Sequence, residues 1–254
     1  MPNKSKLIVA LDVDSLEMVR FLVDGLGGLV DIYKIGSQLF TACGPAAVRF
    51  VMARGKQVFL DLKYHDIPNT VASAVRAAVM LSDAVQRSAV PGETPREGIG
   101  RLAMYTIHTC GGEEMMTAAV KAAQEAAKEI GAVPPLTVGV TVLTSQGDKL
   151  TTQGQSGILS LVLDRARMAK RCGLDGVVSS CHEAAMIRKE FGKDFVIVTP
   201  GIRPSGAEVG DQKRVATPRG AVDAGSNYLV VGRPIVQADN PRTIAQAILD
   251  EMKN

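Results

Sequence analysis

Short apolar runs recur along the chain at intervals that each leave room for a helix, and this alternation is the strongest constraint on the fold. The runs are rich in valine, isoleucine and leucine, as is typical of parallel strands buried on both faces. Strands that alternate with helices indicate an α/β protein with a parallel sheet. Eight runs can be counted, which favours a closed (β/α)8 TIM barrel over an open doubly wound sheet. The predicted strands are residues 7–12, 29–36, 58–63, 104–109, 136–143, 176–179, 195–199 and 227–231.

The chain is expected to form a single domain over residues 1–254, because barrels of this class commonly reach this length without dividing. A hydrophobic content of 46% is enough for one large core. One stretch, residues 82–102, breaks the regular spacing between the third helix and the fourth strand, and it reads as an insertion. A connection from a helix to a strand lies on the barrel face opposite the catalytic loops, so we expect the insertion to affect stability or assembly.

Composition argues against several classes of function. The net charge of +3 is small, and lysine and arginine are spread along the chain without basic blocks, so nucleic-acid binding is not expected. The first apolar run is too short to cross a membrane or to form a signal-peptide core, which predicts a cytoplasmic protein without membrane association. The cysteines and histidines lack metal-ligand spacing, so no metal site is expected. They are Cys43, Cys110, Cys172, Cys181, His65, His108 and His182.

Charged residues stand at the ends of the first three predicted strands. Asp12 ends the first strand, and Lys34 lies near the end of the second. Asp61 and Lys63 end the third, and in a regular strand their side chains share one face. Because the ends of parallel strands meet at one mouth of a barrel, we expect these four side chains to gather there.

Asp66 adds a second acid to the third strand end, and Pro68 after it suits the first turn of a helix. A purely structural alternative is a salt bridge at the strand end, with Asp66 favouring the start of the helix. Against it, three ionisable groups stand within a few positions of each other beside a run apolar enough to be buried. Buried charge is costly unless it is paired or used. Asp61, Lys63 and Asp66 are therefore candidate catalytic residues.

Two late segments, PGIRP and GRPI, follow the seventh and eighth predicted strands, where such barrels usually hold phosphate. Gly232 allows a close backbone approach, and the guanidinium of Arg233 can bind two phosphate oxygens at once. Arg203 is the matching cation of the first segment. Alternatively, both arginines are surface residues and the glycines only form turns. A long polar loop lies between the segments, and Gln212 is its best candidate for a ligand contact.

These motifs closely resemble the orotidine 5′-phosphate decarboxylase family, and the resemblance covers nearly the whole chain. It rests on LDVDS at 11–15, YKIG at 33–36, DLKYHDIPNT at 61–70, VTVLTS at 140–145, TPGIRP at 199–204, DQKR at 211–214 and VVGRPI at 230–235. The resemblance implies a (β/α)8 barrel that converts orotidine 5′-phosphate to UMP and CO2 without a cofactor, in pyrimidine biosynthesis. It also implies a homodimer.

The resemblance further implies a role for each matching residue. A charged network around the reacting carbon would comprise Lys34, Asp61, Lys63 and Asp66. Lys63 would protonate C6 of the pyrimidine, and Asp66 would come from the partner subunit. The substrate-binding residues would be Asp12 and Lys34 at the ribose, Asp61 beside the substrate carboxylate, Thr70 toward the partner's ligand, Thr144 and Ser145 at the pyrimidine, and Arg203, Gln212, Gly232 and Arg233 at the phosphate.

Two other functions fit part of the pattern. A magnesium-dependent decarboxylase or aldolase for sugar phosphates resembles this chain in the acid–x–lysine–x–x–acid strand end, but the DIPNT continuation and the DQKR loop argue against it. Turnover that resists EDTA would separate the two. A non-catalytic nucleotide-binding barrel would keep the phosphate loops and use the charged cluster only for structure. An absorbance assay with orotidine 5′-phosphate decides that case.

Overall fold

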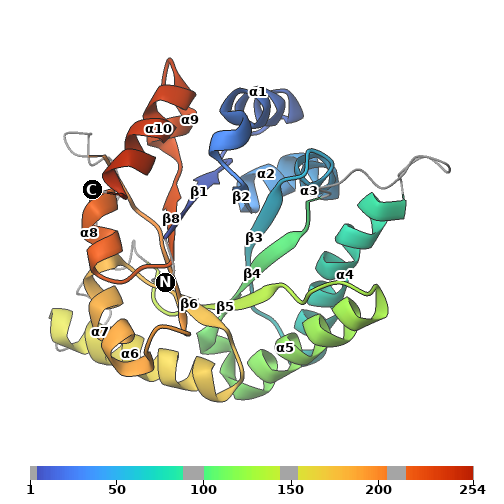
Figure 1. Cartoon of the computed structure of the whole chain (residues 1–254). Helices are drawn as coiled ribbons and strands as arrows, with labels where there is room; N and C mark the ends of the chain where they lie inside the picture. The colour runs from blue at the N-terminus through green and yellow to red at the C-terminus, as the bar shows by residue number, and fades with distance from the viewer. Residues whose placement is uncertain (1–4, 88–99, 144–153, 205–215, 254) are drawn as a thin grey trace.

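The computed structural model describes residues 5–87, 100–143, 154–204 and 216–253. In these residues eight parallel strands close into one barrel, in which each strand pairs with its sequence neighbours and β8 pairs with β1. Figure 1 shows the helices around the outside of the strands. The predicted (β/α)8 barrel is therefore confirmed. The strands are β1 (Lys6–Ala10), β2 (Ile32–Gly36), β3 (Gln57–Tyr64), β4 (Leu102–His108), β5 (Leu136–Val140), β6 (Gly176–Val178), β7 (Val196–Thr199) and β8 (Tyr228–Val231).

The helices form the outer layer of the barrel. Within the described ranges, none of them is long and apolar enough to cross a membrane. They are α1 (Leu16–Leu26), α2 (Ser37–Cys43), α3 (Pro45–Met52), α4 (Pro68–Arg87), α5 (Gly112–Glu129), α6 (Gly154–Arg171), α7 (Cys181–Phe191), α8 (Pro218–Asp223), α9 (Arg233–Val236) and α10 (Pro241–Glu251), with the short 3-10 helices η1 (Gly27–Leu29) and η2 (Thr109–Gly111).

Local sequence rules explain where several elements begin. Ser15 caps α1, because its hydroxyl accepts a hydrogen bond from the Met18 amide at 3.3 Å. Pro68 opens α4, where its missing amide hydrogen leaves no partner unsatisfied. The start of α4 at Pro68 agrees with the sequence prediction. The chain after α1 forms η1, so β2 begins at Ile32 and not at the predicted residue 29.

β1 and β5 end two or more residues earlier than predicted at the catalytic side of the barrel. β1 stops at Ala10, so Asp12 lies in the loop beyond the strand. The Leu11 amide still donates to the Lys34 carbonyl at 2.9 Å, and the chain then turns away toward α1. β5 ends at Val140, before the predicted end at residue 143. The barrel mouth is therefore built more from loops, and less from strands, than the apolar runs suggest.

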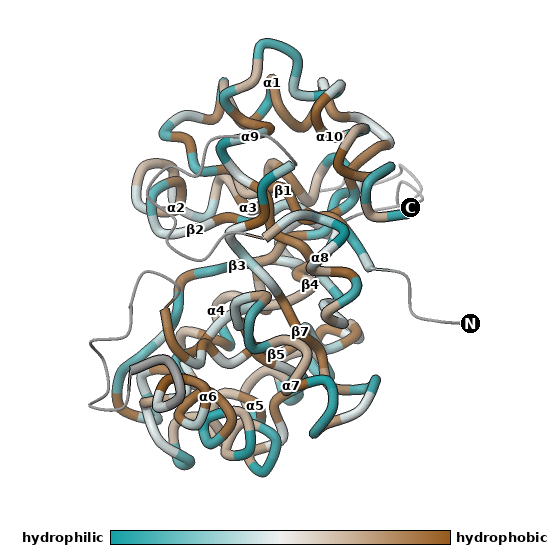
Figure 2. Tube along the Cα trace, turned by 90° about the vertical axis from the view of Figure 1, so that its left-hand side faces the viewer, coloured by the Kyte–Doolittle hydropathy of each residue, from teal (hydrophilic) through white to brown (hydrophobic). Residues whose placement is uncertain are grey.

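Hydrophobic side chains pack in two layers, as the alternation of side chains along a strand requires. One layer fills the barrel interior, and the other lies between the strands and the helices. In Figure 2 hydrophobic segments run along much of the strands, while hydrophilic ones gather at turns and outer helix faces. Because the barrel interior is filled, a ligand site can open only at its ends. The interior residues are Ile8, Ala10, Ile32, Phe59, Met104, Val138, Val198 and Val230.

The predicted insertion at residues 82–102 is partly regular structure. Its first part continues α4 as far as Arg87, and Leu102 already belongs to β4. The Ser82 hydroxyl accepts a hydrogen bond from the Leu102 amide at 3.2 Å, and Ser82 is buried. The two ends of the segment are thus joined directly. Residues 88–99 lie outside the described residues, and their assignment as an insertion stays a prediction.

Candidate active site

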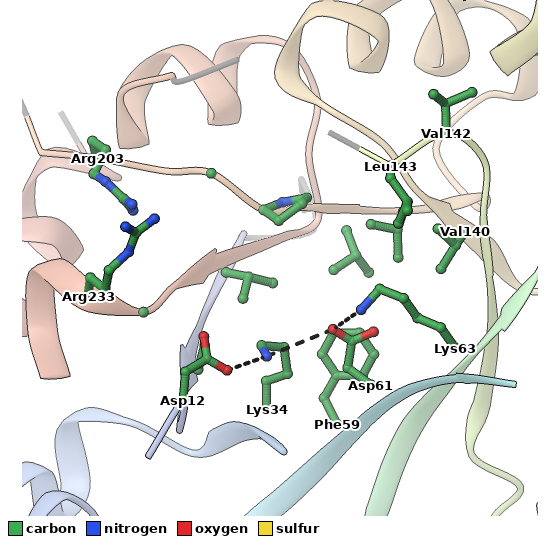
Figure 3. A pocket seen from close by; sticks show the side chains of 17 residues that line it. Asp12, Lys34, Phe59, Asp61, Lys63, Val140, Val142, Leu143, Arg203 and Arg233 are labelled. Carbon is green, nitrogen blue, oxygen red and sulfur yellow. Dashed lines mark hydrogen bonds and ion pairs between the residues drawn. The ribbon is translucent and has the colours of Figure 1, made fainter. Parts of the chain in front are cut away.

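The charged residues predicted at the strand ends meet in one chain of alternating charges (Figure 3). Lys34 Nζ lies 2.9 Å from Asp12 Oδ1 and 3.8 Å from Asp61 Oδ2. Lys63 Nζ lies 2.8 Å from the same Asp61 oxygen. Asp61 and Lys34 are mostly buried, whereas 34% of the Lys63 side chain is exposed. The chain of charges therefore ends on an accessible cation.

The strand that carries Asp61 and Lys63 does not follow the regular alternation that the sequence predicts. β3 and β4 pair at Leu60 and again at Tyr64, and their register shifts between these two residues. Lys63 has a φ of 52°, in the left-handed region that side chains other than glycine seldom adopt. The prediction that the two side chains meet is confirmed, but a bulge in β3 brings them together, not a flat strand. Such strained residues cluster at functional sites.

Thr106 of β4 lies opposite this bulge, and sequence reasoning missed it. Its hydroxyl oxygen accepts a hydrogen bond from the Lys63 amide at 2.9 Å and donates one to Asp61 Oδ1 at 3.0 Å. The residue is fully buried. Met104, two positions earlier in β4, belongs to the barrel interior. Side chains two positions apart in a strand share a face, so Thr106 was also expected to point inward. A polar residue at such a position near a strand end was the sequence signal that could have identified it.

Two glycines make room for Asp12. A Cβ atom on Gly36 would lie 2.9 Å from Lys34 Nζ and 3.6 Å from Asp12 Oδ1. A Cβ atom on Gly232 would lie 3.3 Å from the other oxygen of Asp12 and 3.4 Å from the Ala10 side chain. The YKIG and VVGRPI segments therefore keep their glycines next to the ion pair of Asp12 and Lys34. The sequence analysis predicted a close approach to the backbone at Gly232 but did not identify Asp12 as the neighbouring group.

A pocket opens at the barrel mouth and joins the charged chain to the predicted phosphate loops. Arg203 and Arg233 point toward one another at the end of the pocket away from Lys63 (Figure 3). Two guanidinium groups that face the same space favour an anion between them. Apolar side chains form much of the wall between the two ends, and they are Phe59, Val140, Val142, Leu143, Val178, Val198, Pro200 and Val230. The pocket thus offers positive charge at both ends and an apolar middle.

Two histidines lie beside Lys63. The ring centroids of His65 and His108 are 5.6 Å apart, and the rings are tilted by 50°. Burial lowers the pKa of His108, and electrostatic interactions with His65, Lys63 and Arg165 act in the same direction, whereas Asp61 opposes them. His108 is therefore uncharged at neutral pH. It adds no further positive charge beside Asp61.

Two predicted site residues, Asp66 and Thr70, do not line the described pocket. Asp66 is exposed, and its Oδ1 accepts a hydrogen bond from the Ile67 amide at 2.7 Å. Thr70, in the first turn of α4, is also exposed. Thr144, Ser145 and Gln212 lie outside the described residues, so their roles stay predictions.

Among the described residues, no group of three or more histidine, cysteine, aspartate or glutamate side chains is arranged to hold a metal ion. All four cysteines carry free thiols. The expectation that the protein works without a metal or another cofactor remains a prediction for experiment.

Comparison with known proteins gives one consistent family. The family model described as "Orotidine 5'-phosphate decarboxylase / HUMPS family" matches residues 5–99 and 100–248. The orotidine 5′-phosphate decarboxylase of Syntrophotalea carbinolica is 44% identical over 98% of this chain and 95% of that protein. The enzyme of that name from Vibrio cholerae is 43% identical over 97% of both.

A solved structure shows the same similarity in three dimensions. The crystal structure of orotidine 5′-phosphate decarboxylase from Lactobacillus acidophilus superposes with a TM-score of 0.78 at 33% sequence identity, and it covers 98% of this chain and 100% of its own. Sequence and fold similarity thus extend over nearly the whole chain. The chain therefore belongs to the orotidine 5′-phosphate decarboxylase / HUMPS family.

Proposed function

We propose that this protein decarboxylates orotidine 5′-phosphate to UMP and CO2 without a cofactor, as a step of pyrimidine biosynthesis. The observation that carries the proposal is the Lys63 ammonium, 2.8 Å from Asp61, in a pocket that ends in Arg203 and Arg233. A substrate with a phosphate at one end and a carboxylate at the other fits this distribution of charge. Family membership and the named relatives support the same reaction.

The chemistry of the step explains why fixed charge is needed. Loss of CO2 breaks the bond between C6 and the carboxyl carbon, and the electron pair stays on C6. No neighbouring carbonyl, imine or cofactor delocalises this pair, so electrostatic stabilisation has to lower the barrier. Charges that are already oriented before the reaction stabilise the transition state without further reorganisation.

Lys63 supplies this charge in the proposed mechanism. Its ion pair with Asp61 Oδ2 fixes the direction of the ammonium, and Lys34 on the other side of Asp61 prevents that carboxylate from moving away. The ammonium stabilises the negative charge that develops at C6. It then transfers one proton to C6, which yields UMP.

Arg203 and Arg233 bind the phosphate in this proposal. Binding energy from a group that does not react can position the reacting ring, so the phosphate contributes to the rate as well as to affinity. Arg203 is buried, with 8% of its surface exposed, which fits a cation that is built into a site. Gln212 is proposed to contact the same phosphate, and Thr144 and Ser145 the pyrimidine.

Removing the Arg233 guanidinium tests the phosphate end. Arg233→Ala is expected to lower kcat/KM for orotidine 5′-phosphate by about 100-fold or more, because charge-assisted bonds are lost. Activity on phosphate-free orotidine should change little. Steady-state kinetics with both substrates measures the difference. Arg219→Ala, which removes an exposed arginine of α8 paired with Asp223, is the matched control. Equal losses on both substrates would remove Arg233 from the phosphate site.

Gly36→Ala tests the space around Asp12 and Lys34. The new Cβ atom has to displace the Lys34 ammonium from 2.9 Å, and this should disturb the proposed ribose contacts. Since the lysine is flexible, we expect a rise in KM of only about 3- to 10-fold, on the scale of about 1 kcal/mol. Gly25→Ala in α1, where nothing lies within 4 Å of the added atom, is the control. An unchanged KM would show that Lys34 adapts freely.

We further propose that the active unit is a homodimer in which Asp66 and Thr70 of one subunit reach the site of the other. Both residues are exposed in the single chain, and Ile67 between them exposes 67% of its surface. Contact with a partner subunit would remove this apolar side chain from water. The chain of alternating charges ends on Lys63, so a carboxylate from the partner would extend it in the correct order.

The decisive test of the proposed reaction is an absorbance assay with orotidine 5′-phosphate, in buffer with EDTA and in buffer with Mg2+. Equal turnover in both is expected, since a carbanion held by an ammonium requires no metal. Turnover that EDTA abolishes would favour a metal-dependent reaction of the sugar-phosphate type. Absence of turnover in both buffers would contradict the proposal. We also place the protein in the cytoplasm, where free thiols persist, and cell fractionation tests that location.

A further inference from the structure

We propose that Thr106 is a positioning residue, which sets the Lys63 ammonium against Asp61 by holding the backbone of one and the carboxylate of the other with a single hydroxyl. This inference rests on the proposed decarboxylation. Thr106 does not line the described pocket, so it acts through its two partners and not on the substrate.

The hydrogen-bond geometry assigns a direction to each bond. The Lys63 amide can only donate, and it does so to Thr106 Oγ1 at 2.9 Å. An ionised Asp61 can only accept, so the single hydroxyl hydrogen of Thr106 goes to Asp61 Oδ1 at 3.0 Å. The hydroxyl thus serves as acceptor and donor at once. Thr106 itself has no exposed surface, so its hydroxyl is shielded from bulk water.

The bond from Thr106 gives the two oxygens of the Asp61 carboxylate different partners. Oδ1 is taken by Thr106, and Oδ2 is left to face Lys63 at 2.8 Å and Lys34 at 3.8 Å. Partial rotation of the carboxylate about its last bond would take one oxygen away from Thr106 and the other away from Lys63. The Thr106 hydroxyl opposes that rotation. It therefore fixes the oxygen that orients the ammonium.

The bond to the Lys63 amide supports an unfavourable backbone conformation. Lys63 has a φ of 52°, and a residue other than glycine in this left-handed region is unfavourable and persists only where its surroundings hold it. The register between β3 and β4 is broken between Leu60 and Tyr64, and Thr106 supplies the Lys63 amide with an acceptor there. An amide left without an acceptor in a buried place would be costly. The threonine thus stabilises the bulge that presents Lys63.

The kinetics of two Thr106 variants distinguish a positioning role from a role in core packing alone. Thr106→Val keeps the shape and removes the hydroxyl, whereas Thr106→Ser keeps the hydroxyl and removes a methyl group. If Thr106 positions Lys63, the valine variant should lose kcat while it still binds UMP, and serine should restore the rate. If the residue only fills space, serine should be the more damaging change, because it leaves a cavity.

The experiment compares kcat, KM and UMP affinity for these variants, with affinity measured by titration calorimetry because the chain has no tryptophan. We expect Thr106→Val to lower kcat by about 10- to 100-fold, as for a lost bond to a charged group, with KM and the Kd for UMP within about 3-fold. Thr106→Ser should stay within about 3-fold of wild type. Thr137→Val, which removes another buried hydroxyl bound to Tyr105, is the control and should keep kcat.

An unchanged kcat in Thr106→Val overturns the proposal, and so does a serine variant as slow as the valine variant. If the valine variant does not fold, the serine and alanine variants replace the comparison, and equal rates for these two overturn it. Hydrogen exchange of the Lys63 amide gives a readout that does not depend on activity. Exchange should quicken in the valine variant and not in the serine variant, and an unchanged rate in both contradicts the proposal. An inactive wild type would instead contradict the decarboxylase assignment.

Discussion

Lys63→Ala is expected to fold and to bind UMP, yet to lose decarboxylation by about 1000-fold or more. A general acid alone contributes about 100- to 10,000-fold, and Lys63 also supplies the positive charge at C6 in the proposed mechanism. UMP has no carbanion at C6, so the ammonium contributes more to the transition state than to the binding of UMP. Single-turnover kinetics and calorimetry measure the two effects separately.

Two further variants show whether the ammonium or the backbone is responsible. Lys63 adopts a φ of 52°, which glycine tolerates without strain. Lys63→Gly should therefore be as inactive as Lys63→Ala, although it removes the backbone strain. Lys121→Ala, at an exposed position of α5, should keep full activity. Near-normal turnover in either Lys63 variant would exclude the lysine as the proton donor.

Sequence reasoning predicted the fold and the charged part of the site because both depend on strand ends. The alternation of apolar runs and helices favoured a parallel barrel over an open sheet, and a barrel brings the ends of its strands to one mouth. Asp12, Lys34, Asp61 and Lys63 follow from that rule alone, although the end of the first strand was placed two residues too late. The position of each residue at a strand end was sufficient to predict that these side chains gather, because the barrel geometry brings the strand ends together.

The features that were missed depend on departures from regular geometry. Nothing in DLKY marks the bulge or the left-handed φ of Lys63, because a regular strand would also put Lys63 beside Asp61. Thr106 is distant in the sequence, and its role appears only when β3 and β4 are paired. Gly36 was read as part of a motif, and its steric reason requires the position of the Lys34 side chain. These features depend on how neighbouring strands pair, which the periodicity of the sequence does not reveal.

The proposed sharing of the site makes a second strong prediction, because Asp66 and Thr70 lie exposed outside the pocket of their own chain. In a two-fold dimer each site would use Lys63 of one subunit and Asp66 of the other. Lys63→Ala and Asp66→Ala homodimers should each be nearly inactive, since every site carries one lesion. The informative step is to mix the two inactive proteins and allow their subunits to exchange.

A mixed dimer places both lesions in one site and leaves the other site with an intact Lys63 and an intact Asp66. Random exchange of an equal mixture makes about half of the dimers mixed, each with one good site, so about a quarter of the wild-type activity should return. Activity should appear at the rate at which native mass spectrometry detects mixed dimers. A mixture that stays inactive although mixed dimers are present would show that Asp66 acts within its own chain. In that case the exposed segment with Ile67 has to close over its own pocket, because only such a movement brings Asp66 to Lys63 of the same subunit.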